Sequence, residues 1–246
     1  MNRIKMFKYR ALHSLARTFP FLVLTKRYFM AAKDAWLLQK RSYSQYGEDI
    51  YVEKLLGGIE QGSCIYIDVG ANQPTQISNT YLFYRKGFRG ILMEPNSELS
   101  RLCRRFRKHD AFICAGAAEN AGVAEFRIGD SSVLAGFRED SKAKQTSWVP
   151  LLPVDMIWTD VGKQAPVFLF SIDTEGFDLN VLLGAKKTLQ YTACVVVEAQ
   201  GDYGEISKLL VSFNFEKTSE MGCNTIWINR ENVANLAAES VTMESK

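Results

Sequence analysis

The chain has 246 residues, 47% of them hydrophobic and 23% charged, which is the composition of a soluble globular protein with a large core. The net charge is only +3, and the chain lacks a basic stripe with interleaved aromatic residues, which argues against a nucleic-acid-binding protein. The charge is uneven, because residues 1–41 carry a balance of +9 and leave −6 for the remainder.

Residues 1–41 are predicted to form a basic amphipathic extension. Apolar residues recur there at helical spacing among Lys and Arg side chains; they are Ile4, Phe7, Ala11, Leu15 and Phe19. Such a helix can lie on an anionic membrane surface, and a helix packed on the rest of the protein or an unordered arm explains the pattern equally. The apolar stretch over residues 19–24 is too short to cross a bilayer, and no cleavage site marks a secretory signal.

Five cysteines are scattered along the chain without a C-x-x-C pair, so neither a zinc site nor a disulfide framework is predicted. Cys64, Cys114 and Cys194 lie in apolar runs and are expected in the core. This usage fits a reducing cytoplasm. We therefore predict a cytoplasmic protein, peripheral at the inner membrane face if the extension binds lipid.

From residue 42 onward, helical and strand patterns alternate, which predicts an α/β fold with a mostly parallel, doubly wound sheet. The predicted domain covers residues 42–232, and residues 233–246 are expected to be a flexible tail. The expected elements of the first half are a helix over 49–56, a strand over 64–69, a helix over 78–86, a strand over 90–93, a helix over 99–106 and a strand over 111–115.

The alternation changes after residue 115. Residues 122–128 alternate like an exposed strand, and residues 129–147 form a polar loop in which acceptor specificity is expected to reside. The remaining expected elements are strands over 148–154 and 167–172, a helix over 179–189, a strand over 194–197, a helix over 206–213, and an antiparallel hairpin over 215–217 and 224–229.

The loop after the first strand, residues 68–72 (Asp-Val-Gly-Ala-Asn), indicates the kind of cofactor. A dinucleotide site needs G-x-G-x-x-G so that backbone amides reach a pyrophosphate. Here Gly70 is the only glycine, which favours a nucleoside cofactor without phosphate, such as S-adenosylmethionine. Asp68 or Asn72 would then meet the amino-acid end of the cofactor, and Gly70 would let it lie against the backbone.

A second apolar run ends in Glu94, 26 residues after Asp68. Acids at the tips of adjacent parallel strands lie at the ligand-binding edge of such a sheet, and a carboxylate can accept both hydroxyls of a ribose. Glu94 is therefore predicted to hold the ribose. The alternative for each acid is a helix cap or a loop salt bridge.

Residues 171–176 (Ser-Ile-Asp-Thr-Glu-Gly) follow a central strand, where Asp173, Glu175 and Asp178 crowd together. Crowded carboxylates repel, so one of them is expected to have a raised pKa and to act as a general base. Methyl transfer to a hydroxyl needs such a base. Glu175 and Asp178 are alternatively helix caps, which is the favoured reading for Asp178.

Glu198 ends the next strand and is close enough in this topology to share a divalent metal with Asp173. Oxygen ligands of this kind suit magnesium or manganese. Neither histidine, His13 or His109, lies at a strand tip, which leaves acid–base work to carboxylates. Residues 44–49 (Ser-Gln-Tyr-Gly-Glu-Asp) combine a helix-cap signal with groups that could fold over a cofactor or an acceptor, and both interpretations stay open.

Together these motifs resemble the FkbM family of S-adenosylmethionine-dependent methyltransferases over about residues 42–230. The matching segments, in order, are residues 44–49, 68–72, 78–80, 90–95, 171–176 and 196–198. The resemblance implies a Rossmann-like class I methyltransferase fold and O-methylation of a hydroxyl on a sugar or polyketide-like small molecule. Many relatives are associated with bacterial surface-glycan synthesis.

The resemblance also implies roles for individual positions. The cofactor contacts it implies are Gln45, Asp68, Gly70, Asn72, Asn79, Glu94, Glu119 and Asp173, and the catalytic group comprises Asp173, Glu175 and Glu198. Two positions depart from the family pattern. Ser171 replaces a lysine that many members carry, so no lysine base is expected, and Glu119 stands near where an aspartate often contacts adenine.

The main hypothesis is therefore an S-adenosylmethionine-dependent O-methyltransferase acting on a glycan or another hydroxylated small molecule. An alternative is a nucleotide-sugar or NAD-dependent enzyme, against which the single-glycine loop argues. Another alternative is a non-catalytic scaffold that binds a membrane or a partner through residues 1–41. The acceptor, the metal dependence and the oligomeric state do not follow from the sequence.

Overall fold

The computed structural model describes residues 42–128, 137, 145–198 and 202–244. The predicted extension over residues 1–41 and most of the polar loop over residues 129–147 lie outside the described residues. Among the described helices, none combines the length and the apolar character needed to cross a bilayer.

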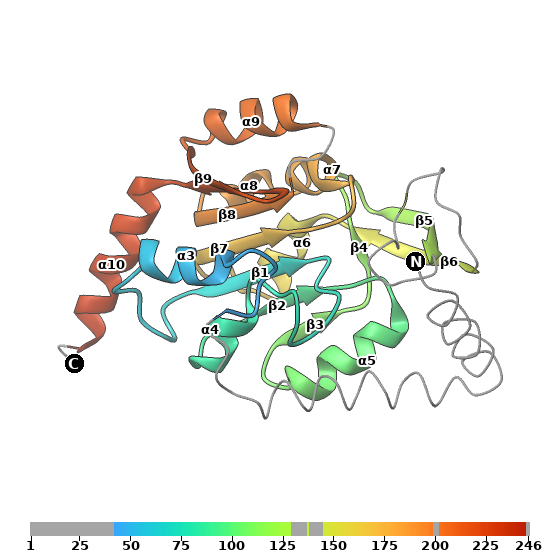
Figure 1. The fold of residues 1–246 in the computed structure, drawn as a ribbon, viewed down its shortest axis with the longest axis horizontal. Coiled ribbons are helices and arrows are strands. Elements are labelled where there is room, and N and C mark those ends of the chain that lie inside the picture. The colour runs from blue at the N-terminus through green and yellow to red at the C-terminus, as the bar shows by residue number, and fades with distance from the viewer. Residues whose placement is uncertain (1–41, 129–136, 138–144, 199–201, 245–246) are drawn as a thin grey trace, which may run out of the picture. The chain divides into compact units, whose positions relative to one another are not determined.

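A seven-stranded sheet forms the centre of the described domain, in the order β3-β2-β1-β7-β8-β10-β9 (Figure 1). The strands from β3 to β8 run parallel, and β10 pairs antiparallel with both β8 and β9. This confirms the expected mostly parallel sheet with a C-terminal antiparallel hairpin. The strand bounds are β1 Ile65–Val69, β2 Arg89–Met93, β3 Ala111–Ile113, β7 Val167–Ile172, β8 Thr192–Glu198, β9 Glu216–Met221 and β10 Asn224–Ile228.

The register brings the carboxyl ends of the central strands to one edge. Val69 of β1 lies opposite Met93 of β2 and Ile172 of β7, and Ile172 lies opposite Val197 of β8. The loops that follow β1, β2, β7 and β8 therefore begin side by side. Ligands of open α/β sheets bind at this edge.

Two hydrophobic cores flank the sheet, because alternate side chains of each strand point to opposite faces. Ile67 belongs to one core with α6–α9, and Tyr66 belongs to the other with α3, α4, α5 and α10. All residues of β7 and β8 are buried, as expected for strands covered on both faces. The helix bounds are α3 Glu48–Leu55, α4 Tyr81–Arg85, α5 Ser97–Phe106, α6 Val154–Asp160, α7 Asp178–Leu183, α8 Lys186–Leu189, α9 Tyr203–Ser212 and α10 Arg230–Glu244.

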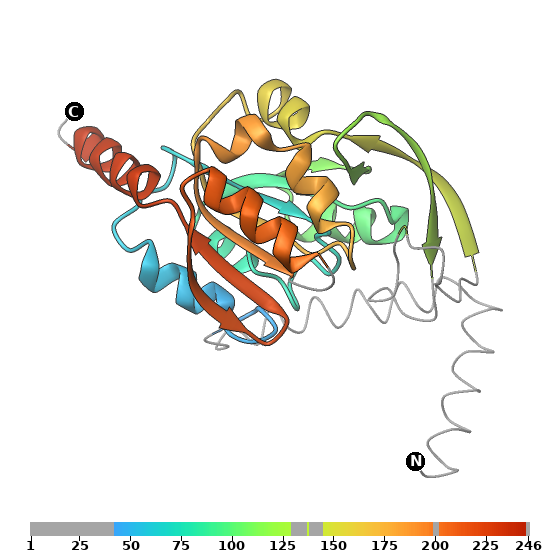
Figure 2. The same ribbon diagram turned by 90° about the horizontal axis from the view of Figure 1, so that it is seen from above.

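A second sheet of three strands has the order β4-β6-β5 and lies at the opposite end of the described domain from α10 (Figures 1 and 2). Its strands are β4 Gly116–Ala117, β5 Gly122–Ile128 and β6 Gln145–Leu152. The expected strand over residues 122–128 is confirmed, whereas β4 and α6 were not predicted. Phe126 and Val149 on the inner face of this sheet are buried.

The expected helix over residues 179–189 is divided into α7 and α8. The Asp155 carboxylate accepts the backbone N–H groups of Lys187 (3.0 Å) and Thr188 (2.8 Å) in the first turn of α8. When a distant acid accepts the unpaired N–H groups in the first turn of a helix, that helix can begin separately from the preceding one. The helical pattern in the sequence does not reveal this break.

The expectation of a flexible tail after residue 232 is wrong for the described residues, because α10 continues to Glu244. Leu236 is buried in the core that also contains Tyr66 and Ile226. The Ser240 hydroxyl accepts the backbone N–H of Glu60 at 3.1 Å. These contacts hold the helix on the domain, and the weak amphipathic pattern of residues 230–244 did not indicate them.

Candidate functional site

A cavity of about 390 Å³ opens at the carboxyl edge of the main sheet. Its volume lies within the range typical of sites for small ligands. The cavity brings together seven of the residues that the sequence nominated: Gln45, Gly70, Asn72, Glu94, Asp173, Glu175 and Glu198. Asp68, Asn79 and Glu119 do not line it.

Glu94, at the end of β2, is buried in the cavity wall and held by two backbone amides. Its Oε2 accepts the N–H of Asn72 at 2.9 Å, and its Oε1 accepts the N–H of Asn96 at 2.8 Å. Burial raises the pKa of Glu94 to about 7, the two N–H groups oppose this rise, and the charge of Asp68 adds to it. A carboxylate offers about four acceptor positions, so two remain for hydroxyl groups of a ligand.

Gly70 has a φ of 79°, and a Cβ at this position would overlap the backbone carbonyl oxygen of Asp173. The glycine therefore lets the loop after β1 pack directly against the loop after β7. The sequence suggested that Gly70 makes room for a ligand. In the structure, the backbone of Asp173 occupies the space that a Cβ at Gly70 would need. The N–H groups of Gly70 and Ala71 both donate to the Met93 carbonyl, which fixes the loop beside β2.

Asn72 provides an acceptor that the described protein does not use. Its backbone has a φ of 42°, and its Oδ1 is buried without a hydrogen bond from any described residue. Buried polar atoms are normally paired, so an orphaned acceptor in a cavity wall is typical of a ligand contact. Together with Glu94, Asn72 fits a nucleoside cofactor that brings hydroxyl and amino groups.

Asp68 is buried and does not line the cavity. Its Oδ2 accepts the Thr80 hydroxyl at 2.5 Å, and Thr80 in turn accepts Nη2 of Arg107 at 3.0 Å. Burial raises the pKa of Asp68, while the Arg107 charge and the Thr80 hydroxyl counteract the rise. Asp68 therefore supports the loop after β1 through its bond with Thr80 and does not reach the cavity itself.

Arg107 is the centre of this network, only 2% exposed. Its Nε donates to Asp110 Oδ2 at 2.8 Å, and three tyrosine rings surround the guanidinium, those of Tyr66, Tyr81 and Tyr84. Burial disfavours its charge, but Tyr66, Asp110 and Asp68 keep its pKa above the ordinary value. No sequence pattern indicated Arg107, because it directly follows a predicted helix that carries several other arginines.

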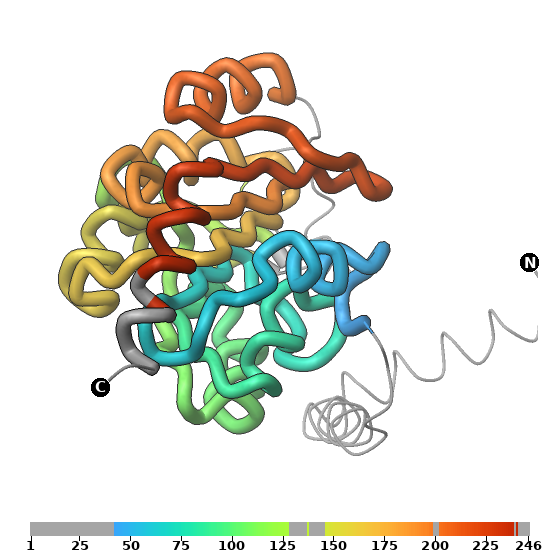
Figure 3. Tube along the Cα trace, turned by 90° about the vertical axis from the view of Figure 1, so that its left-hand side faces the viewer, coloured from blue at the N-terminus to red at the C-terminus, as the bar shows by residue number. Residues whose placement is uncertain are grey.

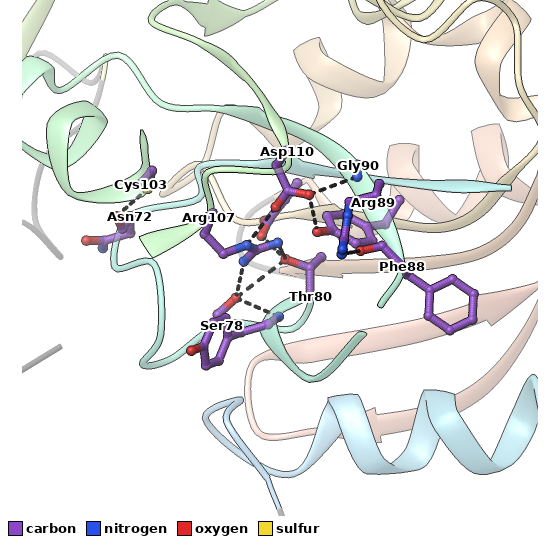
Figure 4. Close-up of polar contacts among 12 residues, drawn as sticks. Asn72, Ser78, Thr80, Phe88, Arg89, Gly90, Cys103, Arg107 and Asp110 are labelled. Atoms are coloured by element: carbon purple, nitrogen blue, oxygen red, sulfur yellow. Dashed lines mark hydrogen bonds and ion pairs between the residues drawn. The ribbon is translucent and has the colours of Figure 1, made fainter. Parts of the chain in front are cut away.

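Asp110 connects this network to the sheet. Its Oδ1 accepts the Tyr66 hydroxyl at 2.6 Å and the backbone N–H of Gly90 at 3.0 Å, so it joins β1 to β2 (Figure 4). Asp110 and Arg107 form an ion pair whose side chains are both 1% exposed. A buried charge without its partner is strongly unfavourable, so the two depend on each other.

The loop after β7 is held by Asp178, the first residue of α7. Its Oδ1 accepts both the N–H of Thr174 (3.0 Å) and the Thr174 hydroxyl (2.8 Å), and its Oδ2 accepts the N–H of Gly176 (3.2 Å). Glu175 has a φ of 55°. Asp178 thus stabilises a turn in which Asp173 and Glu175 are directed to the cavity.

Asp173 is a cavity carboxyl group with a strongly raised pKa. Burial raises its pKa well above the ordinary value, and the charges of Glu198, Glu175 and Asp178 raise it further. A carboxylate in such surroundings takes up a proton readily, as the sequence analysis expected for a base.

Glu198 ends β8 on the other side of Asp173 and is 6% exposed. Burial raises the pKa of the Cys223 thiol to about 11, and the neighbouring Glu198 adds to the rise. Within the described residues, no group of three or more His, Cys, Asp or Glu side chains could hold a metal ion. The hypothesis of a metal shared by Asp173 and Glu198 therefore finds no support.

Residues 42–49 form a compact turn around the buried Asp49. The Asp49 carboxylate accepts the hydroxyls of Ser42 (2.6 Å) and Ser44 (2.9 Å) and the backbone N–H of Tyr43 (2.7 Å). The expected helix cap is only partly realised. Ser44 accepts the N–H of Asp49 at 3.3 Å, while the N-cap position of α3 belongs to Gly47.

Asn79 and Glu119 have structural partners outside the cavity. The Asn79 amide donates to the Ser171 hydroxyl at 3.1 Å, which ties the segment before α4 to β7. The Ser171 hydroxyl thereby serves as a hydrogen-bond acceptor. Glu119 is exposed, and its carboxylate pairs with Lys186 at 3.5 Å.

The cavity residues Phe137 and Cys223 were not singled out by the sequence analysis, which named Tyr46 only as part of the segment over residues 44–49. The Phe137 ring centroid lies 5.2 Å from the ring of Phe126 and 5.2 Å from that of Phe177, so it covers part of the cavity. The sequence signal for Phe137 was a phenylalanine within a polar loop. Tyr46 and Cys223 come from opposite ends of the domain, and no local pattern relates them.

A model of the methyltransferase FkbM domain matches residues 68–221. Among solved structures, the chain is similar to methyltransferase FkbM from Methylobacillus flagellatus KT, with 17% identity and a TM-score of 0.47 over 69% of this chain and 44% of that one. A TehB-like SAM-dependent methyltransferase from Corynebacterium glutamicum has 9% identity and a TM-score of 0.40, over 83% of this chain and 97% of that one.

Fibrillarin, a pre-rRNA processing protein from Methanococcus jannaschii, has 10% identity and a TM-score of 0.39, over 74% of this chain and 76% of that one. The chain thus spans less than half the length of the Methylobacillus protein. No curated protein matches it significantly. Because the domain model covers more than half of the sequence, the chain belongs to the FkbM family of S-adenosylmethionine-dependent methyltransferases.

Proposed function

We propose that the protein is an S-adenosylmethionine-dependent O-methyltransferase whose acceptor is a hydroxyl of a sugar, a glycan or another small molecule. The observation that carries the proposal is the one cavity that Glu94, Asp173 and Glu198 line together. It combines a carboxylate suited to ribose hydroxyls with carboxylates suited to proton uptake.

The cofactor end of the cavity consists of Gly70, Asn72 and Glu94. Glu94 would accept the ribose hydroxyls, and the buried Asn72 Oδ1 offers a further acceptor. When bound, S-adenosylmethionine supplies a methyl group on a positively charged sulfur. The residues of this end orient that cofactor, and alignment of two reactants contributes much of the rate of a transfer reaction.

Asp173 is the proposed general base. Its raised pKa suits removal of a proton from an acceptor hydroxyl while the oxygen becomes a nucleophile. Glu175 and Glu198 lie in the same wall and raise the proton affinity of Asp173. The proton therefore passes to the Asp173 carboxylate, whose pKa the neighbouring carboxylates raise.

The proposed partner is a small-molecule or glycan acceptor, with no role for nucleic acid. A cytoplasmic location and peripheral membrane contact through residues 1–41 remain predictions from the sequence. Co-sedimentation of the full chain and of a chain lacking residues 1–40 with anionic vesicles tests the membrane contact, which requires that only the full chain sediments.

Calorimetry with S-adenosylhomocysteine tests the cofactor assignment directly. The full chain should bind it, and Glu94→Ala should weaken binding at least tenfold, because a charge-assisted hydrogen bond is lost. Glu205→Ala, which removes an exposed glutamate of α9, serves as the control and should bind as the parent does. No binding by the parent chain would exclude the proposed function.

The base is tested with labelled cofactor and a panel of hydroxylated sugars and glycan precursors, with products identified by mass. Asp173→Asn should lower the rate of methyl transfer about 100-fold or more while S-adenosylhomocysteine still binds. An unchanged rate would assign the proton to another group, and Glu175→Gln and Glu198→Gln then identify it.

A further inference from the structure

The segment over residues 42–49 is attached to the C-terminal hairpin through the buried Glu48. Glu48 Oε1 accepts the side-chain amide of Asn224 at 2.6 Å, and its Oε2 accepts the backbone N–H of Tyr46 at 2.8 Å. Glu48 and Asn224 are both buried. One carboxylate therefore fixes the peptide of Tyr46 to the first residue of β10.

Tyr46 lies with its ring on the turn between β9 and β10. A Cβ on Gly222 would overlap this ring, so the glycine supplies the flat surface on which it rests. The hydroxyl of Tyr46 accepts the Gln45 amide at 3.0 Å. The ring is nevertheless 46% exposed and lines the cavity, so it remains accessible to a ligand.

Tyr46 stands at the end of the cavity away from the ribose carboxylate. In the sheet order, β1 and β7 separate Glu94 on β2 from Glu198 on β8, and the β9–β10 turn lies beyond β8. Strands lie about 4.8 Å apart, which separates the two glutamates laterally by roughly 14 Å. Figures 2 and 3 show the first described segment beside this hairpin.

The charged groups among the described cavity residues all have one sign. These residues include four carboxylates, those of Glu94, Asp173, Glu175 and Glu198, and among them there is no Lys, Arg or His. Transfer of an anionic ligand from water into such surroundings is unfavourable, because no described lining residue compensates its charge. An uncharged ligand avoids this cost.

We propose that residues 42–49 form the acceptor subsite and that Tyr46 is its specificity-determining residue, selecting an uncharged ring-shaped polyol. The inference rests on the proposed methyl transfer. The apolar face of the ring packs on the tyrosine, and its hydroxyls meet Glu198 and Gln45. The rigid attachment of Tyr46 through Glu48 holds this surface at a constant distance from Asp173.

The test uses the full chain saturated with S-adenosylhomocysteine and titrated by saturation-transfer NMR with methyl hexopyranosides and the matching uronic acids. The neutral glycosides should bind at least tenfold more tightly than the uronic acids. Tyr46→Ala should weaken the binding of neutral glycosides at least tenfold. Tyr46→Phe should bind them as the parent does, because it keeps the aromatic ring. Affinity for S-adenosylhomocysteine should change less than twofold in both variants.

Gly222→Ala displaces the ring without removing it and should reproduce the loss seen in Tyr46→Ala. The matched control is Tyr191→Ala, which removes a 52% exposed tyrosine that stacks on Trp158 and does not line the cavity. It should bind glycosides as the parent does.

Three results would overturn the subsite: equal binding of uronic acids, unchanged glycoside binding by Tyr46→Ala, or no glycoside binding by the loaded parent. Failure of the parent to bind S-adenosylhomocysteine would instead overturn the proposed function.

Discussion

The two ends of the cavity are built in different ways. At the proposed cofactor end, Glu94 is held by the amides of Asn96 and Asn72, which are 2 and 22 residues away in the chain. At the proposed acceptor end, Glu48 is held by Asn224, 176 residues away. The cofactor end is therefore formed mainly by neighbouring strand–loop–helix units, whereas the acceptor end needs both extremes of the described domain.

In the proposed function, this difference separates the binding of the methyl donor from the choice of the acceptor. Backbone N–H groups from the loops after β1 and β2 hold Glu94. Tyr46 is held by Glu48, which itself depends on the tertiary contact with Asn224, so a change in either the first segment or the hairpin alters its position. The following substitutions test that separation, from the largest expected effect to the smallest.

Arg107→Met should cause the largest loss, because it leaves Asp110 as a buried charge without its ion-pair partner. We expect a decrease of about 3–5 kcal/mol in the free energy of unfolding. Denaturant unfolding measures it, with Arg101→Met on the exposed side of α5 as the control. A decrease below about 1 kcal/mol would show that the network does not support the cofactor end.

Gly70→Ala should destabilise the protein by about 3 kcal/mol, because the new Cβ overlaps the Asp173 carbonyl and the φ of 79° is strained for alanine. The matched control is Gly122→Ala, where a Cβ meets no atom within 4 Å. Thermal unfolding of both variants checks the difference. Equal stability of the two would mean that the loops after β1 and β7 can separate freely.

Glu94 should make the stability of the cofactor end depend on pH. Its folded-state pKa of about 7 exceeds the ordinary value of 4.5, so the folded protein binds the proton more tightly than the unfolded chain. This contribution is complete below pH 4.5 and is lost as the pH rises through 7. It amounts to about 3 kcal/mol for a buried group.

Glu94→Gln should therefore flatten the pH profile of unfolding between pH 4.5 and 7 in the ligand-free protein. In the proposed function, ribose hydroxyls donate to the ionised Glu94 carboxylate, so the parent should also bind S-adenosylhomocysteine more tightly as the pH rises from 6 to 8, by up to about tenfold. Calorimetry at several pH values measures this gain. A gain that persists in Glu94→Gln would assign it to another carboxylate.

Phe137→Ala should have the smallest effect, because Phe137 only covers the cavity through its contacts with Phe126 and Phe177. Loss of such aromatic pairs corresponds to about 1 kcal/mol, or roughly fivefold in affinity for S-adenosylhomocysteine. Trp148→Ala, which removes a 75% exposed ring on β6, is the control. A loss that exceeds that of Glu94→Gln would make Phe137 a principal cofactor contact.

The sequence predicted the parts of the molecule that depend on local patterns. The apolar strands and the acids that end them identified the sheet and placed Glu94 and Asp173, because strand ends in a parallel sheet meet at one edge. The cavity does contain both residues.

The parts that depend on partners distant in the chain were not predictable. The helix pattern over residues 179–189 gave no sign that Asp155 caps α8, and residues 230–244 gave no sign of the core contact made by Leu236. Arg107 looked like one of several solvated arginines until the fold buried it beside Asp110. In each case a tertiary interaction outweighs the local propensity.

The hydrogen bond between Glu48 and Asn224 also sets an order of assembly during synthesis. Because the ribosome makes Glu48 long before Asn224, its carboxylate has no amide partner until the hairpin emerges near the end of the domain. The methyl-donor end can form from earlier segments, since β7 is complete at Ile172. The proposed acceptor subsite is therefore completed only when β10, near the end of the described domain, has been made.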